Sequence, residues 1–116
     1  MSSFILLLHQ PVNRQRPTDP AVATQVTREY MAWADHMREQ GHLKAGNKLT
    51  EDSGKIMRSA GERVSTTDGP YPESKEIVGG FFMLSARDYS EACRLAETCP
   101  HVKYGAYIEV RQIEEL

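Results

Sequence analysis

The chain has no long apolar segment, few cysteines and no excess of positive charge. Its longest unbroken apolar run is Phe4 to Leu8, far shorter than the ~18 residues that indicate a membrane span. This run also lacks the basic start and the cleavage site of a signal peptide, so we expect a cytoplasmic protein with no membrane segment. Fourteen Lys plus Arg against sixteen Asp plus Glu give a net charge of -2, which disfavours nucleic acid as a partner.

The only cysteines, Cys93 and Cys99, lie in a helical pattern. At about 100° per residue they point to different faces of a helix, so we expect two reduced, small apolar side chains and no disulfide. Neither the cysteines nor the histidines show zinc-site spacing, and the sequence predicts no metal site. No Gly-rich phosphate loop follows a strand and no serine lies in a nucleophile elbow, so we expect no cofactor and no acyl-enzyme chemistry.

With 116 residues, 40% hydrophobic and 26% charged, the chain has the size and composition of a single domain, 1–116. Apolar periodicity, prolines and glycines predict its elements. Strands are expected at Ser2 to His9, Leu43 to Leu49, Ile77 to Leu84 and Tyr104 to Ile113, with hairpin arms at Lys55 to Ser59 and Glu62 to Thr66. Helices are expected from the cap Thr18-Asp19-Pro20 to Gly41, and around Tyr89 to Ala96, closed by Pro100.

This order predicts a ferredoxin-like α+β fold of the split βαβ type with an added hairpin. Both helices of such a fold lie on one face of the sheet, so the other face needs a cover. A second copy of the chain is the simplest cover, and we expect a homodimer. Five residues at helical spacing form the stripe of the first helix and are expected in the core: Val22, Val26, Tyr30, Trp33 and Met37.

The segment from Asp68 to Phe82 gathers charged side chains before a strand. Asp68 begins the turn Asp68-Gly69-Pro70 and either bonds its own backbone or acts as a catalytic base. Lys75 is either part of a solvated cluster with Glu73 and Glu76 or binds a substrate carboxylate. The pair Gly79-Gly80 lets another backbone or a ligand approach closely, because it has no Cβ.

His9 ends the first strand, where side chains often line a cleft, and its imidazole titrates near neutral pH. It is our first candidate for proton transfer, and the alternative is a histidine without a chemical role. Glu109 shares a strand face with Arg111, as a rim pair or as a ligand group inside a barrel. The remaining histidines are interpreted as surface residues: His36, His42 and His101.

The motif Asp68-Gly69-Pro70-Tyr71, followed by Glu73, Lys75-Glu76 and Gly79-Gly80-Phe81-Phe82, resembles the signature of YCII-related proteins of the DGPF type. The opening strand, Cys99-Pro100 and the closing Gly105 to Arg111 segment match in the same order. The resemblance implies a dimeric α+β barrel, a fold that includes isomerases, dehalogenating enzymes and cofactor-free monooxygenases. In shorter YCII-like proteins a histidine of the first helix is thought to pair with an aspartate. The position of that histidine corresponds to the region of Tyr30 in this chain, so the resemblance does not supply the histidine–aspartate dyad here.

The leading hypothesis is a dimeric protein that binds a small organic molecule and can carry out cofactor-independent proton transfer. His9 and Asp68 are its catalytic candidates. The substrate-binding candidates are Tyr71, Glu73, Lys75 and Glu109. The alternative is a non-catalytic ligand-binding or protein-association module, and the sequence leaves the substrate open.

Overall fold

Four antiparallel strands form the main sheet, in the spatial order β2-β5-β1-β6. The structure is a computed structural model that describes residues 1–13, 17–69 and 75–116. The four strands are β1 (Ser2–Pro11), β2 (Leu43–Lys48), β5 (Glu76–Ala86) and β6 (Tyr107–Ile113). The first and third of them in sequence lie at the centre and the second and fourth at the edges. This is the ferredoxin-like order, and it confirms the predicted α+β class with its split βαβ plan.

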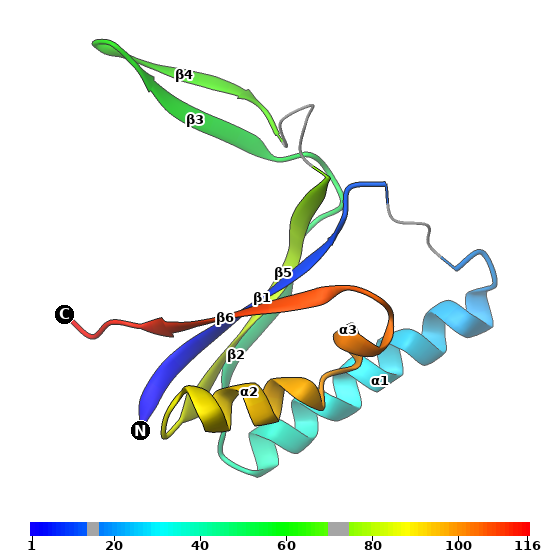
Figure 1. Cartoon of the computed structure of the whole chain (residues 1–116). Coiled ribbons are helices and arrows are strands. Elements are labelled where there is room, and N and C mark those ends of the chain that lie inside the picture. Colours follow the sequence, from blue (N-terminus) through cyan, green and yellow to red (C-terminus); the bar gives the residue numbers. More distant parts are fainter. Residues whose placement is uncertain (14–16, 70–74) are drawn as a thin grey trace.

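A two-stranded hairpin, β3 (Lys55–Ala60) and β4 (Arg63–Asp68), is inserted between β2 and β5. It projects away from the main sheet (Figure 1). Gly61 has a φ of 70° in the tight connection between the two strands, where glycine avoids the strain of a left-handed backbone. The predicted hairpin is therefore confirmed, although β3 runs one residue further, to Ala60, and β4 begins one residue later and ends two residues later, at Asp68.

The helices α1 (Pro20–Glu39), α2 (Tyr89–Glu97) and α3 (Pro100–Lys103) lie on one side of the sheet (Figure 1). The predicted start of α1 is confirmed, because the side chain of Asp19 accepts a hydrogen bond of 2.9 Å from the backbone N–H of Ala21. Pro100 has a different role from the predicted one. It does not close the second helix but begins α3, as a proline does at a first helical position.

The core lies between the helices and one face of the sheet. Leu6 and Leu8 of β1 pack with Trp33 and Met37 of α1 and with Leu84 of β5. Because side chains alternate along a strand, the odd-numbered residues of β1, including His9, point to the other face of the sheet. None of the three helices covers this second face, which we call the open face (Figure 1).

The glycine pair of β5 forms a bulge. Leu8 pairs with Gly80 and His9 pairs with Val78, which leaves Gly79 as the extra residue. A Cβ on Gly79 would lie 2.5 Å from Oε1 of Gln10, and one on Gly80 would lie 3.1 Å from the carbonyl oxygen of Asn47. The pair thus lets neighbouring groups approach closely, as predicted.

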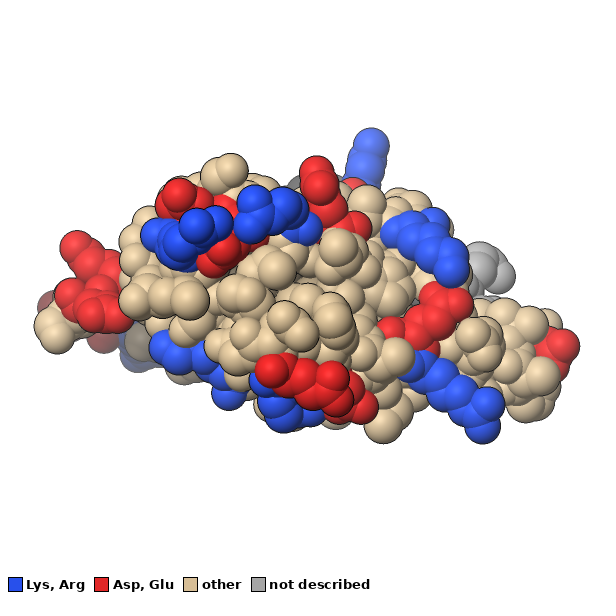
Figure 2. Space-filling view, turned by 90° about the horizontal axis from the view of Figure 1, so that it is seen from below, with Lys and Arg blue, Asp and Glu red and all other residues tan. Residues whose placement is uncertain are grey.

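Charges of both signs are interspersed on the face of the molecule seen in Figure 2. On that view no continuous patch of Lys and Arg appears among the described residues. Within the described part of the chain, no helix is long and apolar enough to cross a membrane.

Candidate functional site

A pocket of about 430 Å³ lies between α1 and the helix-covered side of the sheet. Its α1 wall includes Val26 and Met31, and its sheet wall includes Leu8 and Phe82. Sites for small ligands in proteins have this size and are mostly apolar, with a few polar groups. The polar side chains around this pocket are Gln10, Thr27, Tyr30, Asn47, Lys48 and His101.

The pocket has room because several positions around it carry little or no side chain. On α1 these positions are Ala23 and Ala34, and on the sheet they are Gly46 and the bulged pair Gly79 and Gly80. Larger side chains at these sites would extend toward the space between the two layers. The glycine pair singled out in the sequence therefore contributes to a site by leaving space for it.

His101 connects the pocket wall to the end of β1. Its side chain comes from α3 and is nearly inaccessible, at 3% exposure, and its Nε2 lies 2.7 Å from the carbonyl oxygen of His9. A carbonyl oxygen cannot donate a proton, so Nε2 carries the proton of the neutral ring. Nδ1 is then the acceptor, and the Tyr30 hydroxyl, 2.8 Å away, donates to it. A directed chain of hydrogen bonds runs from Tyr30 through His101 to the His9 carbonyl.

The interpretation of His101 as a surface residue was wrong. α3 packs against both α1 and β6, and this packing buries the histidine that follows Pro100. The Tyr30 partner is 71 positions away in sequence, so no local pattern predicts the contact. The one available signal was the hydroxyl of Tyr30 on an apolar stripe, since a buried tyrosine hydroxyl usually has a hydrogen-bond partner.

His9 lies on the open face, on the opposite side of the sheet from the pocket. Its Nε2 donates to Oε1 of Glu109 at 2.9 Å, and its ring stacks on Tyr107 with centroids 4.5 Å apart. Arg111 contacts the second carboxylate oxygen of Glu109 at 3.3 Å. The hydrogen bond from His9, followed by that from Arg111, lowers the pKa of Glu109. The structure thus brings together two of the sequence candidates, His9 and Glu109.

The other candidates do not join this pair. Asp68 ends β4 and forms an ion pair with Lys55, in which both side chains are largely exposed. Lys75 is exposed, and its carbonyl oxygen accepts a hydrogen bond of 2.9 Å from the N–H of Val12. Tyr71 and Glu73 lie outside the described residues. Within the described chain, no cluster of His, Cys, Asp or Glu has the arrangement of a metal site.

Sequence comparison identifies the family. The YCII-related domain matches residues 4–116, nearly the whole chain. The chain belongs to this family. Membership confirms the resemblance drawn from the motif around Asp68 and from the last strand. No curated protein matches the sequence of this YCII-related protein.

A solved structure with a similar fold is that of 5-chloro-2-hydroxyhydroquinone dehydrochlorinase, TftG, from Burkholderia phenoliruptrix, in complex with 2,5-dihydroxybenzoquinone. The similarity covers 96% of this chain and 93% of that one, with a TM-score of 0.51 and 14% sequence identity. At this identity the similarity shows the fold, and it agrees with the α+β architecture of the YCII-related protein.

Proposed function

We propose that this YCII-related protein binds a small organic molecule in the pocket between α1 and the sheet, and transfers a proton on it without a cofactor. The pocket itself carries the proposal. Its volume of about 430 Å³ suits a molecule of one or two rings, and its walls combine apolar side chains with hydroxyl, amide and imidazole groups. Such a lining favours a flat, mainly apolar ligand that bears hydroxyl or carbonyl oxygens.

The structural neighbour supports the same class of ligand. TftG acts on a chlorinated hydroxyhydroquinone and was solved with a dihydroxybenzoquinone, and both compounds are single rings with several oxygens. We extend to the YCII-related protein only this class, a ring compound with hydroxyl or carbonyl groups. Removal of chloride is not part of the proposal.

The catalytic roles of His9 and Asp68 stay predictions. His9 and Glu109 form a hydrogen-bonded acid and base pair, which is a suitable arrangement for proton transfer on the open face. Asp68 has Lys55 as its partner, an arrangement that favours a structural role in the hairpin. Among the described residues that line the pocket, none of His9, Asp68 and Lys75 occurs.

Filling the pocket tests the proposal. Ala34 lines it from α1, whereas Ala32 is exposed on the same helix and does not line it. We expect Ala34→Phe to abolish binding of hydroxylated benzoquinones and phenols, and Ala32→Phe to leave it unchanged. A ligand at about 100 times its Kd stabilises the folded state by about 2.7 kcal/mol, so a thermal-shift screen followed by calorimetric titration detects the binding.

Two results would contradict the proposal. The first is a panel of such ring compounds in which none raises the melting temperature of the wild-type protein. The second is binding that Ala34→Phe and Ala32→Phe affect equally, which would place the ligand elsewhere. Ligand binding in the pocket without turnover would instead support the non-catalytic alternative.

A further inference from the structure

We propose that Tyr30 and His101 are the proton-transfer pair of this pocket, with His101 as the base and the Tyr30 hydroxyl as the group that contacts the ligand. The inference rests on the proposed function, because it assigns catalytic residues to the same pocket. It concerns neither of the catalytic candidates from the sequence, His9 and Asp68.

Both ring nitrogens of His101 form hydrogen bonds, which hold the ring in one orientation. Nε2 donates to the His9 carbonyl at 2.7 Å, and His9 is the last residue of β1 that pairs with β6. This carbonyl therefore lies where the ladder between β1 and β6 ends, although β1 continues to pair with β5 as far as Pro11. Nδ1 receives the Tyr30 hydroxyl at 2.8 Å, and the two rings meet edge to face with centroids 6.2 Å apart. The geometry fixes which nitrogen can accept a further proton, namely Nδ1.

Among the described residues that line the pocket, His101 is the only histidine and no Asp or Glu occurs. The other polar groups are less suited to act as a base. The Lys48 amine lies 2.6 Å from the carboxylate of Glu51, and the Thr27 hydroxyl donates to the carbonyl of Ala23 at 3.1 Å. The amides of Gln10 and Asn47 do not accept protons near neutral pH. An imidazole does, so His101 is the pocket's base.

The step is a transfer of one proton along two hydrogen bonds. The O–H bond of a weakly acidic ligand hydroxyl breaks, and its proton forms a new O–H bond at Tyr30. The original O–H bond of Tyr30 breaks at the same time, and that proton forms an N–H bond at Nδ1 of His101. The ligand becomes an anion and His101 an imidazolium with both N–H groups bonded, so charge balances and no oxidant or reductant is needed.

The first test needs no ligand. Long-range ¹H–¹⁵N spectra of histidine-labelled protein distinguish the two neutral tautomers of an imidazole. We expect His101 with its proton on Nε2, and we expect Tyr30→Phe to shift the Nδ1 resonance because this nitrogen loses its donor. Tyr104→Phe is the matched control, since it removes a hydroxyl that donates to Glu29 and lies outside the pocket lining. A proton on Nδ1 in the wild type would overturn the inference.

The second test uses 4-nitrophenol, a weak acid whose phenolate absorbs in the visible range, at a pH where the free probe is neutral. We expect wild-type protein and Tyr104→Phe to bind it as the phenolate while His101 gains a second N–H. Tyr30→Phe keeps the ring and should bind the probe with a Kd within about tenfold, the range of one hydrogen bond, but in its neutral form.

The outcomes separate this inference from the proposed function. If Tyr30→Phe ionises the probe as the wild type does, the pair is not the proton acceptor, although the pocket still binds. If wild type binds the probe and Ala34→Phe does not weaken the binding, the pocket is not the binding site and the proposed function fails. If wild type does not bind this probe, the tautomer of His101 decides the inference alone.

Discussion

At the scale of single residues, the two cysteines show how burial decides chemistry. Cys93 is exposed on α2, whereas Cys99 is 2% exposed and packs in the core cluster. Burial raises the pKa of the Cys99 thiol from 9.0 to about 11, because a thiolate loses its hydration there. Both thiols are free, as the sequence predicted. The sequence predicted a small apolar side chain at both positions, and of the two only Cys99 is buried in the core.

We predict that the native protein has a single reactive thiol. At pH 8 about one in a thousand Cys99 side chains is ionised, because its pKa is about 11 and the thiolate is the reacting form. Titration with DTNB should label one equivalent in the folded protein and two after unfolding in guanidinium chloride. Cys93→Ser should abolish the native reaction. Rapid labelling of two thiols in the folded state would contradict the burial of Cys99.

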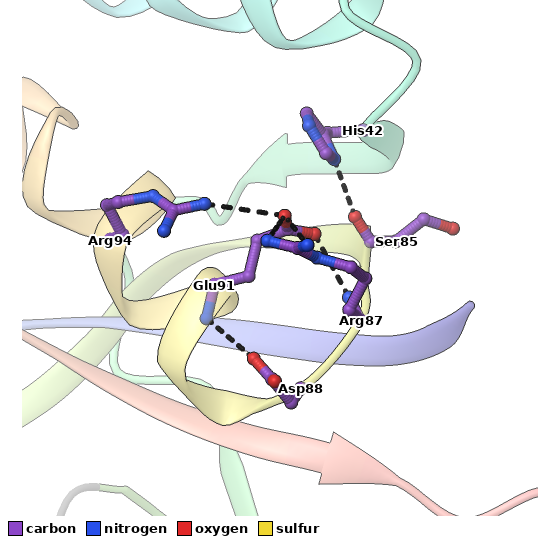
Figure 3. A network of polar contacts seen from close by, with 6 residues as sticks. All are labelled: His42, Ser85, Arg87, Asp88, Glu91 and Arg94. Atoms are coloured by element: carbon purple, nitrogen blue, oxygen red, sulfur yellow. Dashed lines mark hydrogen bonds and ion pairs between the residues drawn. The ribbon is translucent and has the colours of Figure 1, made fainter.

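At the scale of elements, the start of α2 depends on a small network of charges (Figure 3). Asp88 caps the helix by accepting the N–H of Glu91 at 2.9 Å. The Glu91 side chain reaches back to the N–H of Arg87 at 3.0 Å and pairs with the guanidinium groups of Arg87 and Arg94. The backbone hydrogen bond from Arg87 is the largest cause of the lowered pKa of Glu91.

We predict that Glu91→Gln lowers the melting temperature by a few degrees at pH 7. The folded pKa of Glu91 lies below its ordinary 4.5, so the ionised carboxylate stabilises the fold above that pH. This contribution is lost as the pH falls through the folded pKa. The difference in melting temperature between wild type and Glu91→Gln should therefore shrink as the pH falls below 4.5. An equal difference at all pH values would rule out the charge as its cause. Glu97→Gln, an exposed carboxylate of the same helix, is the control.

The hairpin is the element with the fewest contacts to the rest of the chain. Nearly all of its side chains are exposed, and an isolated two-stranded hairpin is at best marginally stable in water. Lys55 and Asp68 pair across its open end, where the chain enters and leaves. Next to this pair, the N–H of Gly69 donates to the carbonyl of Gly54 at 3.3 Å, which joins the two ends of the hairpin just outside its strands.

We predict that Asp68→Asn changes the free energy of unfolding by less than about 1 kcal/mol, the usual limit for an exposed ion pair. The side chains of Lys55 and Asp68 are 69% and 74% exposed, so water screens their attraction. Urea denaturation of wild type, Asp68→Asn and Lys55→Gln measures the effect. If Asp68→Asn instead abolishes turnover of an identified substrate without loss of stability, the catalytic role predicted from the sequence is correct.

At the scale of the whole molecule, the shape is more extended than the length suggests. The radius of gyration is 16.2 Å, against about 13 Å for a compact domain of this size. The projecting hairpin accounts for the shape (Figure 1).

The open face of the main sheet is the second feature of the whole molecule. Alternation along its strands places apolar side chains there, including Ile5, Leu7, Phe81 and Met83.

We predict that the protein is a homodimer in which a second copy covers this face. A sheet face that carries apolar side chains and has no helix over it normally packs against another layer. Light scattering coupled to gel filtration should give twice the 13.1 kDa of one chain, and Met83→Glu at the centre of the open face should shift the mass toward one chain. Val102→Glu, on the exposed side of α3, should leave the mass unchanged. A single-chain mass for the wild type across the micromolar range would disprove the dimer.

The sequence by itself determined the elements and most of the fold. The periodicities of two and of three to four follow from backbone geometry, so β1, α1, β5 and β6 could be predicted from local patterns. The helix cap at Asp19 and the glycine turns could be predicted for the same reason, because they depend only on residues that are close in sequence. The motif around Asp68, together with the last strand, was enough to recognise the YCII-related family.

Only the tertiary structure decided which residues meet. Tyr30 and His101 are 71 positions apart, and His9 and Glu109 are 100 apart, so each contact depends on how helices and strands pack. Side chains alternate along a strand, so His9 and Leu8 lie on opposite faces of the sheet. His9, the first candidate for proton transfer in the sequence, therefore does not line the pocket. A connector that looked exposed became α3, and its His101 was buried. Packing across long separations, which no local pattern contains, therefore fixed the site.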